Sequence, residues 1–237
     1  MALPRLNDNP QYELKIPSSQ QVVKFRPFLV KEQKVLLIAY ESQDRKQILS
    51  AMLDTIGVCI SEPIDIKKLS TFDVDYMFTM IRSKSVGETT DILIQCSDCD
   101  TQNEVKVKLD DIEVPVEKQE MLIPINDKMN VRMKYPNYDF FLNNNTLLDS
   151  TKTQSEIILS MIVGCLESIE TEEERINLID ESEEEILGFL ESLTTAQFDK
   201  ISNFVLNIPA MEHDLAFKCV SSGKDNKRKL KGLEDFF

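Results

Sequence analysis

The N-terminal part of the chain alternates apolar and polar positions in two short runs. These runs are Tyr12–Ile16 and Val22–Phe28, and Pro17–Gln20 separates them. An alternation with period two is typical of a half-buried strand, and the turn-forming residues between the runs predict a β-hairpin. Pro27 has no backbone N–H to donate, so we expect the second strand to lie at an edge or to end there.

From Lys31 the apolar positions follow a helical spacing instead. A first helix is predicted from Lys31. A second is predicted after Asp44, which forms an N-cap pair with Gln47. A third is predicted from Ser70, where Asp73 can complete the cap, and it should end near residues 85–87.

The middle of the chain returns to strands, and the second half is dominated by helical spacing. Strands are predicted at 91–95 with 104–109, and at 121–125 with 130–135. Residues 154–206 are predicted to be helical throughout, with an apolar stripe from Ile157 to Ile169 and capping boxes at Ser182 and Thr194. Pro209 should end the last helix.

Because helices and strand pairs are segregated along the chain, the predicted class is α+β. The expected architecture is an N-terminal hairpin, helical segments, two hairpin knuckles at 91–109 and 214–231, and a helical bundle in the C-terminal half. Four segments are expected: 1–90 with the hairpin and helices, 91–135 with the first knuckle and a further hairpin, 136–210 as a helical region, and 211–237 packing back on 91–109.

The two knuckle segments look like copies of each other, and one copy has lost a thiol. The first carries Cys96 and Cys99 in a C-x-x-C arrangement, and the second carries Cys219 with Ser222 at the corresponding position. Two knuckles that face each other would build a four-thiolate zinc site. Serine is a poor zinc ligand, so the sequence leaves two alternatives open: bound Zn²⁺, or two hairpins that pack together without metal.

A fourth sulfur could come only from Cys59 or Cys165. Both lie on apolar helical stripes, where a buried free thiol is the simpler interpretation. Five scattered cysteines are also an odd number, which argues against a disulfide framework and favours a reducing compartment.

Charge and hydropathy restrict the classes of partner. The chain of 237 residues has a net charge of −14, which disfavours nucleic acid and anionic lipid. No apolar run approaches the length of a membrane span. Carboxylates are dense from Glu167 to Glu185, and Lys224–Lys231 is basic. Each is either a solvated face or a surface that docks a partner of opposite charge.

Catalytic chemistry is hard to find in this sequence. His213 is the only histidine, and there is no glycine-rich phosphate loop, nucleophile elbow or His-Glu-x-x-His motif. Cys96 and Cys99 could form a redox pair, but such a pair normally opens a helix, whereas strands flank this one. We therefore expect a protein that is not an enzyme.

Several segments together resemble one family, the T4-type phage baseplate proteins. The resemblance lies in Phe25–Asp44, Phe72–Glu88 with the knuckle that follows, Met133–Pro136 and Gly232–Phe237. It implies a non-enzymatic protein tied to the baseplate hub of contractile-tailed phages, either as a hub subunit or as an assembly factor (a chaperone or scaffold). It also implies hub proteins as partners, and a location in the host cytoplasm during assembly or in the virion baseplate.

The C-terminal segment supplies the residues that we expect to bind a partner. They are Lys227, Arg228, Lys229, Phe236 and Phe237. The two terminal aromatic rings either fold back into the core or anchor a partner. Two alternative functions stay open at this point: a zinc-ribbon adaptor that binds nucleic acid, and a thiol-dependent redox enzyme.

Overall fold

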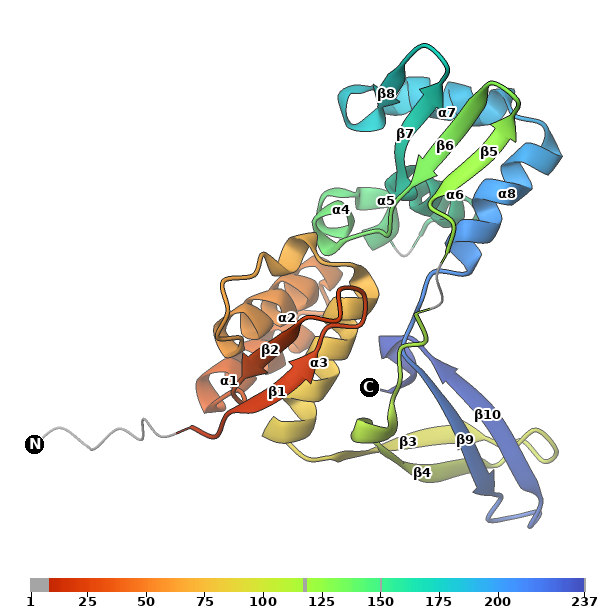
Figure 1. The fold of residues 1–237 in the computed structure, drawn as a ribbon. Helices are drawn as coiled ribbons and strands as arrows, with labels where there is room; N and C mark the ends of the chain where they lie inside the picture. The colour runs from red at the N-terminus through yellow and green to blue at the C-terminus, as the bar shows by residue number, and fades with distance from the viewer. Residues whose placement is uncertain (1–8, 117–118, 150, 237) are drawn as a thin grey trace, which may run out of the picture. The chain divides into compact units, whose positions relative to one another are not determined.

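The computed structural model describes residues 9–116, 119–149 and 151–236, and they form two compact units (Figure 1). The first unit joins the described residues up to Val116 to those from Pro209 onward. The second unit consists of the described residues between these two stretches. The second is therefore an insertion in the first, and each is described by itself below.

The first unit begins with the predicted hairpin and three helices. The elements are β1 (Tyr12–Lys15), β2 (Val22–Phe25), α1 (Val30–Glu41), α2 (Arg45–Cys59) and α3 (Thr71–Ser85). The strands pair antiparallel, with Tyr12 opposite Phe25. Asp44 caps α2 as expected, since its carboxylate accepts the backbone N–H groups of Lys46 and Gln47.

The cap predicted for α3 is different in the structure. Ser70 occupies the N-cap position but makes no side-chain cap hydrogen bond. Asp73, which is fully buried, accepts hydrogen bonds from the backbone N–H (2.8 Å) and hydroxyl (2.6 Å) of Ser18 instead. This carboxylate therefore joins the helix to the N-terminal hairpin, because a buried charge must be hydrogen-bonded wherever a partner lies.

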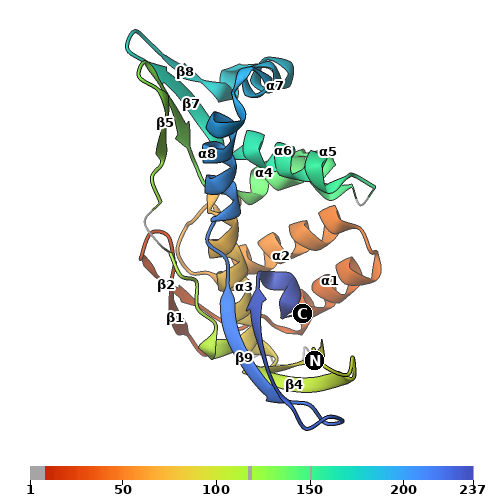
Figure 2. The same ribbon diagram turned by 90° about the vertical axis from the view of Figure 1, so that its right-hand side faces the viewer.

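Two further hairpins complete the first unit. They are β3 (Thr89–Gln95) with β4 (Gln102–Lys108), and β9 (Glu212–Lys218) with β10 (Asp225–Lys231). Each is a two-stranded antiparallel sheet, and the two lie side by side (Figures 1 and 2). One buried cluster contains residues of both hairpins: Ile94, Val107, Leu109, Ile112, Met211, Leu215, Leu230 and Phe236. The two stretches of the chain that form the first unit therefore share a core.

Helix α3 connects the N-terminal helices to the hairpins. Ser83 donates its hydroxyl to Asp110 (2.8 Å), and Lys84 bonds the other oxygen of that carboxylate (2.7 Å). On the same helix the buried Thr79 hydroxyl lies 3.4 Å from the sulfur of Met211, just before β9. The hairpins are thus held against the body of the unit by buried and half-buried contacts.

The second unit is a four-stranded antiparallel sheet with helices. The strands, in sheet order, are β5 (Leu122–Asn126), β6 (Met129–Met133), β7 (Leu166–Thr171) and β8 (Arg175–Asn177). The helices are α4 (Tyr138–Asn143), α5 (Asn145–Leu148), α6 (Gln154–Cys165), α7 (Glu183–Ser192) and α8 (Thr195–Leu206). Ile162, Ile186 and Ile201, from three of these helices, share a buried core with Val131 and Ile169 of the sheet.

The predicted α+β class is confirmed, but the prediction that residues 154–206 are helical throughout is wrong. Helix α6 ends at Cys165, and the next six residues form β7, which pairs with β6 so that Ile169 lies opposite Val131. The apolar stripe continued because both elements face the same core. The capping boxes at Ser182 and Thr194 are confirmed as the starts of α7 and α8.

Candidate metal centre

The two knuckle turns have the same backbone conformation. In the first, Cys96 N–H donates to the Thr101 carbonyl (2.9 Å), and in the second, Cys219 N–H donates to the Lys224 carbonyl (2.9 Å). Each turn contains one residue with a positive φ at the corresponding place, Asp100 at 55° and Gly223 at 69°. The resemblance between the two sequence segments is therefore a resemblance in structure.

Two buried asparagines join the turns in a reciprocal way. Asn226 of β10 accepts the backbone N–H of Ser97 in the first turn (3.1 Å), and Asn103 of β4 accepts the backbone N–H of Val220 in the second (2.9 Å). The two side chains are 7% and 2% exposed. Each also donates its amide within its own hairpin, to the Lys224 and Thr101 carbonyls respectively. The pair relates the hairpins by an approximate twofold arrangement.

This geometry brings three thiols together. The sulfur atoms of Cys96, Cys99 and Cys219 all lie within 4.8 Å of one another, and the Sγ atoms of Cys99 and Cys219 are 3.6 Å apart. Ser222 is at the fourth corner, with its Oγ 3.8 Å from Cys96 Sγ. Cys96 and Cys219 are buried, whereas Cys99 is exposed. The cluster predicted from the sequence is thus assembled from residues far apart in the chain.

Hydrogen bonds at the turns favour the thiolate form. The hydroxyl and then the backbone N–H of Ser222 lower the pKa of Cys219 from its ordinary value to about 6. The backbone N–H groups of Asp98 and then Cys99 lower the pKa of Cys96. Since the thiolate is the form that binds metals and acts as a nucleophile, both sulfurs have the chemistry of ligands.

The spacing of the donors fits a tetrahedral zinc ion. Zinc–sulfur bonds of about 2.3 Å in a tetrahedron require donors about 3.8 Å apart. The Cys99–Cys219 and Cys96–Ser222 separations of 3.6 and 3.8 Å have this length. Cys96, Cys99 and Cys219 would hold the ion, and the Ser222 hydroxyl would be the fourth group, which is a much weaker donor than a thiolate.

The other two cysteines lie elsewhere, as free buried thiols. Cys59 ends α2, and burial raises the pKa of its thiol to about 11. Cys165 ends α6 in the second unit, where burial raises the pKa of its thiol to about 12. Neither belongs to the donor cluster, so neither supplies the missing fourth sulfur.

The residues predicted to bind a partner divide into three groups. Lys227, Arg228 and Lys229 are exposed on β10, although Lys229 also bonds Glu212 (2.7 Å). Phe236 is fully buried in the core that the two hairpins share, so it takes the fold-back alternative, and a partner-anchoring role does not fit it. Phe237 lies outside the described residues.

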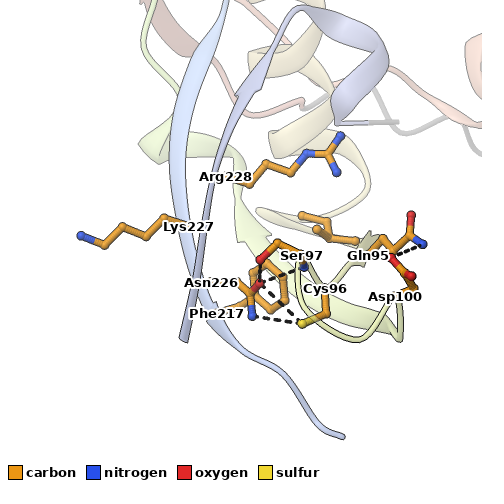
Figure 3. Close-up of a pocket in the computed structure, with 9 residues that line it drawn as sticks. Gln95, Cys96, Ser97, Asp100, Phe217, Asn226, Lys227 and Arg228 are labelled. Atoms are coloured by element: carbon orange, nitrogen blue, oxygen red, sulfur yellow. Dashed lines mark hydrogen bonds between the residues drawn. The ribbon is translucent and has the colours of Figure 1, made fainter. Parts of the chain in front are cut away.

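A shallow hollow of about 270 Å³ lies beside the knuckles (Figure 3). Its lining includes Cys96 and Asn226 at the base of the turns and Lys227 and Arg228 on β10. In Figure 3 the long side chains of Lys227 and Arg228 extend away from Cys96 and Asn226. The hollow therefore combines a basic strand with the back of the thiol cluster, and its shape is open.

The remaining candidate groups serve local structure. His213 Nδ1 lies 3.3 Å from the Asp111 carbonyl oxygen. In the acidic segment, Arg132 bonds Glu170 (2.6 Å) and holds the pKa of that carboxyl below its ordinary value. A general acid needs a raised pKa, so Glu170 does not have the property that acid catalysis requires.

Sequence reasoning missed the two asparagines. Asn103 and Asn226 stand at the same position in the two similar segments, after the first cysteine of each knuckle. Their matched positions in the two segments are the signal that could have found them.

Comparison with known proteins identifies one family. The family model described as "T4 bacteriophage base plate protein" matches residues 9–237 of the chain. Neither the curated proteins nor the solved structures contain a match. Within the described residues, every helix is too short or too polar to cross a membrane.

Proposed function

The chain belongs to the T4 bacteriophage base plate protein family, and from this premise we propose that it acts at the hub of the baseplate. Its role there is to bind hub proteins without catalysis, either as a structural subunit or as a factor that helps the hub to assemble. The observation that carries the proposal is the extent of the family match, which includes every helix and strand of both units.

Helix α1 supports a binding role because the second half of the helix is apolar on every side. The run Val35–Tyr40 consists of six consecutive apolar residues, and six residues span more than one helical turn. Ala39 is buried, whereas Leu37 and Ile38 are 55% and 56% exposed and Tyr40 is 74% exposed. A helix that is hydrophobic all round is typically buried, so this face suits contact with another protein.

The basic strand β10 supplies a second surface of the first unit. Lys227 and Arg228 are consecutive on it and both exposed, so their side chains lie on opposite faces of the hairpin. On a chain with a net charge of −14, such a basic strand suits an acidic surface of a partner, since opposite charges steer association. The second unit has an acidic surface, formed by Glu172, Glu173 and Glu174 at the turn between β7 and β8. This surface suits a basic region of a partner.

Co-expression of the tagged chain with baseplate hub proteins tests the proposal. Removing residues 223–237 would delete β10 with the buried Leu230 and Phe236, so a point substitution is the sharper probe. The wild-type chain is expected to co-purify with at least one hub protein. Arg228→Glu should weaken this binding, whereas the same charge change at the exposed Lys108 of β4 should leave it intact.

Failure of the wild-type chain to retain any hub protein would overturn the proposal. Mass spectrometry of purified phage particles then separates its two forms. A hub subunit remains in the virion baseplate, whereas an assembly factor acts in the host cytoplasm and is absent from the finished particle.

A further inference from the structure

We propose that the chain binds one structural Zn²⁺ ion through the thiolates of Cys96, Cys99 and Cys219, with the Ser222 hydroxyl as the fourth donor. This inference is independent of the hub proposal. It rests on the side-by-side arrangement of two similar turns, on the donor distances and on the groups that surround the sulfur atoms. Its consequence is a metal that closes the first unit by joining its N-terminal and C-terminal parts.

The donors lie close enough together to share one ion, since the three sulfur atoms are within 4.8 Å of one another. The two distances that join opposite pairs of donors are 3.6 Å, from Cys99 Sγ to Cys219 Sγ, and 3.8 Å, from Cys96 Sγ to Ser222 Oγ. Both agree with the separation of about 3.8 Å expected for zinc–sulfur bonds. Each turn contributes two adjacent corners, as in zinc sites built from paired knuckles.

The surroundings of the sulfur atoms supply the outer hydrogen bonds that metal-bound thiolates require. The Ser222 backbone N–H points at Cys219 Sγ (3.5 Å). The Asn226 side-chain amide donates to Cys96 Sγ from the opposite hairpin (3.5 Å; Figure 3). Such contacts orient the ligands and tune their basicity. The asparagine therefore acts twice, by joining the hairpins and by positioning a ligand.

Because three of the four donors are soft thiolates, the site favours zinc over hard cations. Thiolates suit Zn²⁺, Cu⁺ and iron–sulfur clusters, whereas Mg²⁺ and Ca²⁺ take oxygen ligands. Iron–sulfur clusters are generally held by four cysteines, and this site has three. An oxygen donor beside three sulfurs in a tetrahedron fits zinc. Each cysteine binds the ion as a thiolate.

The role of the ion is structural, because it joins segments that the sequence separates. Cys96 and Cys99 lie between β3 and β4, and Cys219 lies between β9 and β10. Exposure of Cys99 leaves one edge of the site open to solvent, so a chelator can reach the metal. Because serine replaces a thiolate, affinity should be lower than in a four-thiolate site, and Ser222→Cys should increase it.

The test uses the full chain purified under reducing conditions with zinc in the growth medium. Metal analysis and native mass spectrometry are expected to find one zinc per chain. Cys96→Ser and Cys219→Ser should each lose the metal. Cys165→Ala removes a buried thiol outside the cluster and should keep it, which controls for thiol loss alone.

Substitution with Co²⁺ keeps the test decisive even if a cysteine variant fails to fold. Cobalt in the wild-type site should give the visible bands of tetrahedral coordination and sulfur charge-transfer absorption. In Ser222→Cys the charge-transfer intensity should rise by about a third, from three thiolates to four, and zinc should be released by chelator at least about tenfold more slowly.

Four results would overturn the proposal. One is a reduced wild-type chain that takes up neither zinc nor cobalt. Another is retention of stoichiometric zinc by Cys219→Ser. The third is unchanged cobalt absorption in a folded Ser222→Cys variant, because the fourth corner would then lie outside the coordination sphere. Copper or iron in place of zinc in the metal analysis counts against it in the same way.

Discussion

At the scale of single residues, the join between the two hairpins depends on a reciprocal pair of amides. Asn103 and Asn226 each accept a backbone N–H from the opposite turn and donate to a carbonyl of their own hairpin. Both side chains are buried, so their polar atoms find hydrogen-bond partners within the protein, across the two turns and within their own hairpins. The turns therefore face each other for a reason that does not require metal.

Replacing Asn103 with alanine tests this join. Asn103→Ala removes a buried side chain with its hydrogen bonds to the Val220 N–H and the Thr101 carbonyl, so we expect the free energy of unfolding to fall by about 1–3 kcal/mol. Gln102→Ala is the matched control, since Gln102 is the exposed neighbour on β4, and it should change stability by less than about 0.5 kcal/mol. Urea unfolding of the zinc-free proteins measures both. Equal effects of the two substitutions would contradict the role of the amide.

At the start of α6, the carboxylate of Glu156 makes the stability of the folded chain depend on pH. The Glu156 carboxylate accepts the backbone N–H and hydroxyl of Thr153 and bonds Lys152, and these contacts, the backbone one first, lower its pKa from 4.5 to about 2. Because the folded-state pKa lies below the ordinary value, the stabilisation is present above pH 4.5. It is lost as the pH falls from 4.5 toward about 2.

Glu156→Gln keeps the shape of this cap and removes its titration. The stability difference between the wild type and this variant is expected to be constant near neutral pH and to shrink as the pH falls through that window. Urea unfolding at a series of pH values measures it, with Glu191→Gln on α7 as a control at an exposed position. A difference that stays constant or grows in acid would show that the charge of Glu156 does not act in this way.

At the scale of elements, α1 exposes several large apolar side chains, among them Val35, Leu37, Ile38 and Tyr40. Leu37 lies opposite the buried face and contributes little to the core of its unit. We therefore expect Leu37→Asp to change the free energy of unfolding by less than about 0.5 kcal/mol and to abolish co-purification with hub proteins. Gln33→Asp introduces the same charge on the same helix and should retain binding. Binding by Leu37→Asp at the wild-type level would exclude α1 as the docking helix.

Local signals predicted most of these elements. Alternation predicted the N-terminal hairpin, and the cap at Asp44 and the capping boxes at Ser182 and Thr194 predicted the starts of α2, α7 and α8. Strand β7 was missed because its apolar residues continue the stripe of α6, and only pairing with β6 determines that Ile169 belongs to a sheet. Long-range pairing of this kind overrides local propensity.

The candidate site was predictable to a similar degree. Repetition of the knuckle segment indicated that Cys96, Cys99 and Cys219 would meet, since similar hairpins pack well against each other. Burial of Phe236 could not be decided from the sequence, because a terminal aromatic ring suits a core and an interface equally. Asn103 and Asn226 stand at matched positions in the two segments, but asparagine is not a zinc ligand, so the motif for a metal site did not single them out.

At the scale of the whole molecule, the second unit is inserted into the first between Val116 and Pro209. Each unit has its own buried cluster, one around the sheet β5–β8 and one between the hairpins. Units with separate cores can unfold separately. Calorimetry of the zinc-loaded chain should therefore resolve two transitions.

Substitutions should move these transitions one at a time. Cys219→Ser is expected to lower only the transition of the first unit, by removing the metal that joins its hairpins. Cys165→Ala should lower only that of the second, since it leaves a cavity in the core of that unit. A single transition that both variants shift equally would show that the units unfold as one.

The proposed role at the hub implies that the baseplate hub is not built without this chain. Its most direct test is to interrupt the gene in the phage and to examine the tail structures in infected cells by sedimentation and electron microscopy. We expect incomplete hubs and no finished baseplates, with assembly restored by the wild-type chain supplied in trans. Finished baseplates at the normal yield in the absence of the chain would contradict the account.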